Sequence, residues 1–270
     1  MQFFRRIGYF LVASNLVVSF SGGFLAFGIA RHFSLEHPLR YASILFLLIF
    51  AVYTLQRIVD QSGFSASEPS VWGNATAIPV VFSLVALLGA FILGISVFHF
   101  SPSLVFLSVF FSFLCYWYTV PFFGQKLREI PGIKIVVTAM TWSYGCVVFP
   151  LINEGIPLQE TLLFSLLFFL YLTAIILPFD IRDVHIDDVH HSTVPQRIDI
   201  PLTKLLGTVL LIGFTAGNIG YGFIAVDNWI FHIAVALQLL FLLFTSEKRG
   251  YFFFGCIDLL MMLLGWSYLL

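Results

Sequence analysis

The sequence predicts an all-α polytopic membrane protein. Of its 270 residues, 60% are hydrophobic and only 10% are charged, whereas an ordinary globular domain is about 25% charged. Apolar runs recur along the whole chain, and the 33 phenylalanines are too many for a compact water-soluble core. The runs are continuously apolar rather than alternating, which favours membrane-spanning helices over the strands of a barrel.

Run length predicts the number of spans. A helix needs about 20 apolar residues to cross the hydrocarbon core of a bilayer. By this measure we expect about nine transmembrane helices in a single domain, residues 1–270. The candidate spans are residues 8–30, 41–60, 76–99, 102–121, 133–152, 159–180, 203–223, 228–245 and 250–269.

Two helix ends resemble each other and suggest an internal repeat. The second span ends in the polar residues 53–60, and the sixth ends in the polar residues 180–187. Each is the second helix of a group of four, and internal repeats are common in membrane folds. We therefore expect two four-helix halves around a central chamber, with these polar ends facing each other.

The distribution of Lys and Arg predicts the orientation. Basic residues favour cytoplasmic loops, and the loops on the side of the N-terminus carry eleven of the 13 Lys and Arg. This places the N-terminus in the cytoplasm and the C-terminus outside, in a multi-pass protein of the cell (cytoplasmic) membrane. The formal net charge of −1 provides no field that would attract nucleic acid. The eleven Lys and Arg on the side of the N-terminus are Arg5, Arg6, Arg57, Lys126, Arg128, Lys134, Arg182, Arg197, Lys204, Lys248 and Arg249.

Three carboxylates at the end of the sixth span carry the strongest chemical signal. Asp180, Asp183 and Asp187 have the spacing i, i+3, i+7, which places them on one face of a helix. Clustered carboxylates repel one another, and a divalent cation removes that conflict. Mg²⁺ typically takes one or two carboxylates together with substrate phosphates. The alternative interpretation is a solvated acidic loop without a common task.

Two further groups lie on the same predicted side. Gln56 and Asp60 share a helix face in the second span, with Arg57 beside them. Tyr118 ends the fourth span, and Lys126 and Arg128 follow in the next loop, where they could hold a diphosphate. The alternatives are an anchoring arginine, an aromatic belt at the membrane surface and basic residues that only set topology.

Together these residues resemble the UbiA-type intramembrane prenyltransferase family. Residues 180–187 match the second aspartate motif of that family, D-x-R-D-x-x-x-D, and Thr193-Val194-Pro195 follows as it does there. Tyr118 and the basic residues around 126–128 resemble the tyrosine and lysine region of the family after its fourth helix. The resemblance covers essentially the whole chain.

The first motif departs from the family pattern, N-D-x-x-D-x-x-x-D. Val52 and Tyr53 occupy the Asn-Asp positions and Gln56 replaces the central aspartate, whereas Arg57 and Asp60 match. A glutamine oxygen can ligate Mg²⁺ but brings no charge.

The resemblance implies Mg²⁺-assisted transfer of a polyprenyl group from its diphosphate to an aromatic or lipid-like acceptor. The partners it implies are the polyprenyl diphosphate, a hydrophobic acceptor and membrane lipid. The departure in the first motif leaves an alternative open, a catalytically inactive or transport protein that binds an isoprenoid or lipid on the same fold. The role of Asp258, a carboxylate inside the last span, also stays open. The implied residues are Asp183, Arg182 and Tyr118 for catalysis, Asp180, Asp183, Asp187, Asp60 and Gln56 for the metal, and Arg57, Lys126, Arg128 and Arg182 for the diphosphate.

Overall fold

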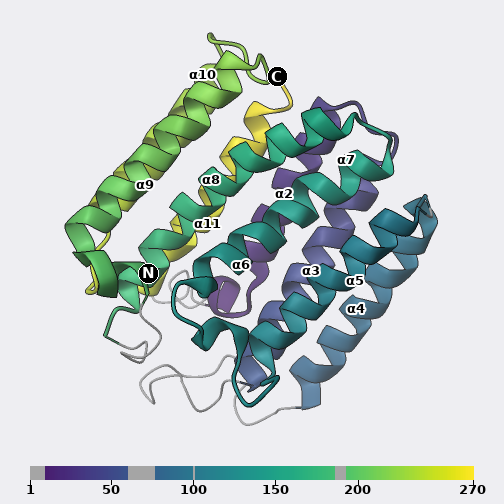
Figure 1. The fold of residues 1–270 in the computed structure, drawn as a ribbon, viewed down its shortest axis with the longest axis horizontal. Coiled ribbons are helices and arrows are strands. Elements are labelled where there is room, and N and C mark those ends of the chain that lie inside the picture. Colours follow the sequence, from purple (N-terminus) through teal and green to yellow (C-terminus); the bar gives the residue numbers. More distant parts are fainter. Residues whose placement is uncertain (1–9, 60–76, 100, 186–192) are drawn as a thin grey trace.

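The computed structural model consists of helices and connecting turns, without strands, within the residues it describes, which are 10–59, 77–99, 101–185 and 193–270. The predicted all-α polytopic architecture is confirmed (Figure 1). The α-helices are Leu16–His32 (α2), Pro38–Val59 (α3), Ala77–Val97 (α4), Pro102–Thr119 (α5), Ile133–Ser143 (α6), Phe149–Asn153 (α7), Leu158–Arg182 (α8), Val194–Gly220 (α9), Trp229–Phe244 (α10) and Tyr251–Ser267 (α11).

Within the described residues, each predicted span contains a helix. Six of these helical segments are long and apolar enough to cross a membrane, and α2, α10 and the end of α11 are shorter apolar helices. The fifth span is composite, because a π-helical segment, Tyr144–Val148 (η2), joins α6 to α7 without a break in the chain direction. Such segments interrupt the regular α-helical hydrogen-bond pattern.

Two boundaries differ from the predicted ones for local backbone reasons. The first span was expected to be continuous from residue 8, but Asn15 has a left-handed φ of 63° and interrupts the helix between the helical residues 10–13 and the start of α2. The seventh span was expected from residue 203, but α9 begins at Val194, where the Thr193 amide donates to the Gln196 side chain. Asp199, also left-handed at φ 63°, then separates this first turn from the rest of α9.

The helices pack as two groups around α2 and α6. α2 lies between α3 and α11, α3 packs against α4, and α5 packs against α6. α8 packs against α6 and α9, and α10 packs against α9 and α11. In Figure 1, α3, α4 and α5 therefore lie on one side of the bundle, and α8, α9 and α10 lie on the other.

The contact between α2 and α11 depends on two glycines. A methyl group at Gly28 would overlap the Gly265 carbonyl, and one at Gly265 would lie 2.9 Å from the Leu25 Cα. Small residues allow helix backbones to approach closely, which is a principal source of helix association in a bilayer. This seam holds the last helix against the first.

One end of the bundle is tied together by a polar cluster. The Asn153 amide donates to the Tyr41 hydroxyl at 2.6 Å and to the Val97 carbonyl at 2.8 Å. The His99 amide donates to Asn153 Oδ1, and the Tyr41 hydroxyl donates to Glu154. These bonds satisfy polar groups of α3, α4 and α7 that lipid could not satisfy.

The start of α2 and the C-terminus lie at opposite ends of the bundle. Tyr268 contacts the rings of His32 and Phe164, at the end of α2 opposite Asn15. Of the described Lys and Arg, only Arg31 and Arg40 lie at that end, as the sequence predicts. Which end faces the cytoplasm remains a prediction.

The glycine seam gives a stability prediction. We expect Gly28→Ala to destabilise the protein by about 1–3 kcal/mol, because the new methyl group forces the two backbones apart. Gly94→Ala is the control, since nothing lies within 4 Å of its added methyl group. That change should be neutral or stabilising, because alanine favours helices over glycine. Thermal unfolding of both variants in detergent measures the difference. Equal melting temperatures would contradict the importance of the close contact between α2 and α11 at Gly28.

Candidate functional site

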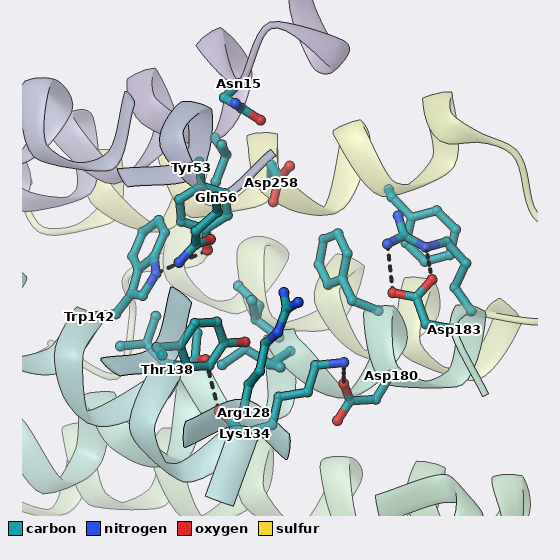
Figure 2. Close-up of a pocket in the computed structure, with 18 of the residues that line it drawn as sticks. Asn15, Tyr53, Gln56, Arg128, Lys134, Thr138, Trp142, Asp180, Asp183 and Asp258 are labelled. Carbon is teal, nitrogen blue, oxygen red and sulfur yellow. Dashed lines mark hydrogen bonds and ion pairs between the residues drawn. The ribbon is translucent and has the colours of Figure 1, made fainter. Parts of the chain in front are cut away.

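A cavity of about 300 Å³ lies at the end of the bundle where α2 begins (Figure 2). Its walls come from α2, α3, α5, α6, α8 and α11 and from the loop before α6. Most of the predicted site residues line it, although they are spread over the sequence from residue 56 to residue 183. The polar lining residues are Asn15, Tyr53, Gln56, Arg57, Tyr118, Arg128, Lys134, Thr138, Trp142, Asp180, Arg182, Asp183 and Asp258.

Asp180 is held by an ion pair between two helices. It lies in the last turn of α8 and is only 2% exposed. Lys134, in the first turn of α6, places its Nζ 3.1 Å from Asp180 Oδ1. A carboxylate this buried needs a nearby positive charge, because its isolated transfer out of water is very costly. The pair therefore fixes the end of α8 against the start of α6.

Asp183 forms a second ion pair with its neighbour in sequence. Arg182 donates from Nε to one carboxylate oxygen at 2.6 Å and from a terminal nitrogen to the other at 2.8 Å. The guanidinium also lies 4.8 Å from the centre of the Phe254 ring on α11. This two-point geometry is a strong form of carboxylate recognition.

Two of the three predicted aspartates lie together at the end of α8. The helix ends at Arg182, and Asp183 is its C-cap residue. The predicted alignment of Asp187 with them stays a prediction. Asp187 and Asp60 both lie outside the described residues.

The predicted basic residues separate into two groups. Arg57 and Arg128 line the cavity, and Arg57 donates a hydrogen bond to the Ala13 carbonyl. Lys126 is not among the lining residues. Its backbone amide donates to Glu129 at 2.8 Å, next to the 3₁₀ turn Leu127–Glu129 (η1). Lys134, which the sequence placed among the basic residues on the same side of the membrane, forms an ion pair with Asp180.

Aromatic residues form part of the wall. Tyr118, predicted from the end of the fourth span, lines the cavity at the end of α5. Trp142 on α6 donates from Nε1 to the Tyr53 hydroxyl on α3 at 3.3 Å. Tyr53 occupies a position where the family motif has an aspartate. Its hydroxyl accepts this hydrogen bond between two helices. Sequence reasoning did not identify Trp142, which lies within an ordinary apolar run.

The polar side chains of the cavity fall into two regions. Figure 2 shows Arg128, Lys134 and Asp180 in one region, and Asn15, Gln56 and Asp258 in the other. Asp258 lies on α11 between two cavity residues of the same helix, Phe254 and Met261. Gln56, predicted as a metal ligand, is thus in the region away from Asp180.

The donor set of the cavity fits a magnesium ion that is completed by substrate. Among the described residues, no group of three or more His, Cys, Asp or Glu could enclose a metal. Asp180 and Asp183 nevertheless both line the cavity. A magnesium ion that keeps phosphate oxygens and waters needs no more than one or two carboxylates from the protein.

Three solved structures share this fold across nearly the whole chain. No protein-family model matches the sequence, and no curated protein matches it. A structure of digeranylgeranylglyceryl phosphate synthase aligns with a TM-score of 0.60 at 12% identity, over 98% of this chain and 96% of that chain. A UbiA homologue from Archaeoglobus fulgidus bound to DMAPP and Mg²⁺ aligns with a TM-score of 0.60 at 12% identity, over 97% and 98% of the two chains. The same homologue bound to GPP and Mg²⁺ aligns with a TM-score of 0.60 at 13% identity, over 97% and 99%.

The fold and the cavity define a multi-pass membrane protein with a charged chamber at one end of its helix bundle. More particularly, its fold is that of the UbiA-type prenyltransferases, and the resemblance predicted from the sequence is confirmed at the level of the fold.

The Lys134–Asp180 pair gives a second prediction. We expect Lys134→Met to destabilise the protein by about 3 kcal/mol, because a buried carboxylate loses its lysine. Adding Asp180→Asn to the same protein should recover most of that loss. Lys248→Met, at an exposed position, is the control. Melting temperatures of the wild type, Lys134→Met, Asp180→Asn and the double variant form a double-mutant cycle, and strictly additive effects would show that the two residues do not interact.

Proposed function

We propose that the chain is a membrane prenyltransferase that moves a polyprenyl group from its diphosphate to an aromatic or lipid-like acceptor. The observation that supports this most directly is a single cavity that combines paired carboxylates, several cations and an apolar wall. The fold agrees, because neighbours with the same architecture include a prenyl-lipid synthase and a protein bound to prenyl diphosphates with Mg²⁺.

The charged region is suited to the diphosphate. Arg57, Arg128 and Arg182 line the cavity together with Lys134, and their side chains can donate hydrogen bonds to phosphate oxygens. The same cations neutralise the charge that develops as the bond between carbon and the leaving oxygen breaks.

Asp180 and Asp183 would hold Mg²⁺, and we propose that Asp60 and Asp187 contribute from their neighbouring segments. When bound, the ion supplies charge neutralisation to the leaving diphosphate. Tyr118 lies at the same wall, where its hydroxyl can contact the diphosphate or the reacting carbon.

The apolar wall is suited to the prenyl chain. Leu172, Ile175 and Ile176 line the cavity from α8, and Val18 lines it from α2. Such a surface accepts an isoprenoid tail and excludes water, which shields an electron-deficient allylic carbon from hydrolysis.

The excess of basic residues at the cavity end supports a cytoplasmic location for that end, because Lys and Arg favour cytoplasmic loops. We therefore propose a cell-membrane protein with its N-terminus in the cytoplasm and its C-terminus outside.

A second candidate function is isoprenoid or lipid binding without turnover. The contact between Tyr53 and Trp142 favours it, because a family aspartate position is used for contact between helices. The experiment below separates the two functions.

The test uses purified protein in lipid nanodiscs with radiolabelled geranyl or farnesyl diphosphate, a panel of acceptors, and Mg²⁺ present or absent. We expect Mg²⁺-dependent binding and the formation of a prenylated product with release of diphosphate. Binding of the prenyl diphosphate without product from any acceptor would favour the non-catalytic function. Absence of Mg²⁺-dependent binding would contradict the enzyme.

Asp183→Asn tests the metal assignment. We expect the ratio of diphosphate affinities with and without Mg²⁺ to fall about tenfold, because a charged ligand is lost. The ratio is the appropriate measurement, since the variant also releases Arg182, which can bind diphosphate without metal. Asp227→Asn, at an exposed position at the opposite end of the bundle, is the control. An unchanged ratio in Asp183→Asn would remove this residue from the metal site.

A further inference from the structure

The cavity ends inside the bundle on a floor to which five helices each contribute one residue. On each helix, this residue is the lining residue furthest from the charged end of the cavity. Figure 2 shows two of them, Tyr53 and Trp142, on the opposite side of the view from Asp180 and Asp183. The floor consists of Val18 on α2, Tyr53 on α3, Trp142 on α6, Leu172 on α8 and Met261 on α11.

Trp142 is the largest residue of the floor, and contacts with two other helices hold its indole ring. Its Nε1 donates to the Tyr53 hydroxyl at 3.3 Å, and the two rings meet edge to face with their centroids 6.3 Å apart. The ring also lies against Gly22 on α2, where an added methyl group would be 2.8 Å from the indole Cζ3. Glycine therefore leaves the space that the indole occupies, and the hydrogen bond sets the orientation of the ring.

The interior beyond the floor is filled by side chains. Leu25 on α2, Phe168 on α8 and Leu264 on α11 lie further from the charged end, and all three are fully buried in the hydrophobic core. Protein interiors are packed with few voids larger than a water molecule. A chain that enters from the charged end would have to displace this core to pass the floor.

Contacts on both sides of α11 close the wall of the cavity there. The rings of Phe179 on α8 and Phe254 on α11 lie 5.3 Å apart between their centroids. On the other side of α11, an added methyl group at Gly255 would lie 2.6 Å from Val12, in the segment before α2. An apolar chain inside the cavity is therefore directed along the helices, toward Trp142.

The depth of the cavity can be compared with the length of a prenyl chain. Trp142 follows Lys134 by eight residues, and Leu172 precedes Asp180 by eight residues. At 1.5 Å per residue, both helices place the floor about 12 Å from the ion pair at the charged end. Each isoprene unit adds four carbon–carbon bonds, which extend about 5 Å. Two units therefore fit above the floor, and a third would reach into it.

We propose that the floor selects the length of the prenyl donor, that Trp142 determines this specificity, and that the donor is a prenyl diphosphate of one or two isoprene units. This inference rests on the proposed function, because it requires the diphosphate to be held at the charged end while the tail points to the floor. A longer tail would have to push the indole off Gly22 and break its hydrogen bond to Tyr53.

The test measures binding of dimethylallyl, geranyl and geranylgeranyl thiodiphosphates to the full-length protein in nanodiscs with Mg²⁺. Each analogue competes with radiolabelled geranyl thiodiphosphate. The measured quantity is the ratio of two affinities, compared between proteins, because partition of an analogue into the lipid is the same for every variant. We expect Trp142→Ala to reduce the preference for the geranyl over the geranylgeranyl analogue about tenfold, since space opens for a longer tail.

Val18→Phe is an independent variant with the opposite effect. The larger side chain moves the floor toward the charged end, so it should weaken the geranyl relative to the dimethylallyl analogue about fivefold or more. Trp229→Ala makes the same change as Trp142→Ala at an exposed position at the other end of the bundle, and should keep the wild-type ratios. An unchanged ratio in Trp142→Ala would overturn the inference, and so would an unchanged ratio in Val18→Phe, which decides alone if Trp142→Ala does not fold.

A parallel measurement with geraniol and geranylgeraniol, which have no diphosphate, judges the proposed function separately. If no thiodiphosphate binds in a Mg²⁺-dependent manner but Trp142→Ala still shifts the ratio of the two alcohols, the prenyltransferase assignment fails and the floor stands. If the thiodiphosphates bind and their ratios are the same in every variant, the enzyme assignment stands and this inference fails. If neither class binds, both fail.

Discussion

The close approach of α2 and α11 at Gly28 and Gly265 is the constraint on which the cavity depends. In a bilayer the lipid tails are as apolar as the side chains, so helix association relies on close packing and hydrogen bonds. A larger residue at either position would separate the first helix from the last. The Asp258 helix would then no longer stand opposite the end of α8, and the walls of the cavity would not face one another.

The two ends of the bundle use polar groups in different ways. At one end, Asn153 links Tyr41, Val97 and His99 in a compact set of hydrogen bonds that joins three helices. At the other end, carboxylates and cations surround a hollow in place of a packed cluster. Charged groups in a low-dielectric setting are costly unless they are paired. Their concentration at one end therefore marks that end as the place where the protein meets a polar ligand.

Much of this arrangement could be predicted from the sequence, because the bilayer imposes simple rules on it. Run length identified the spans, and the segregation of Lys and Arg placed Arg57, Arg128 and Lys134 at one end of the bundle. The spacing of Asp180 and Asp183 at the end of a span brought both to the cavity. These signals are local, or they follow from the direction in which each helix crosses the membrane.

Other features depend on backbone geometry and packing that no local pattern reveals. No local pattern marks Asn15, whose left-handed backbone conformation interrupts the first span and whose side chain lines the cavity. The end of α8 at Arg182, with Asp183 as its C-cap residue, was not visible in the aspartate spacing. Asp258 was visible as a carboxylate within an apolar run, but its position opposite Lys134 required the packing of α11 against α2.

The two ion pairs of the cavity bear on how a reaction would end. Lys134 and Arg182 each hold a carboxylate, so each cation already has a partner within the protein. Under the proposed function, these cations exchange carboxylates for phosphate oxygens when the diphosphate enters and return to the carboxylates when it leaves. When the diphosphate leaves, neither cation therefore remains unpaired in a low-dielectric chamber. Because product release limits the rate of many enzymes, such an exchange would favour rapid turnover over a tightly trapped diphosphate.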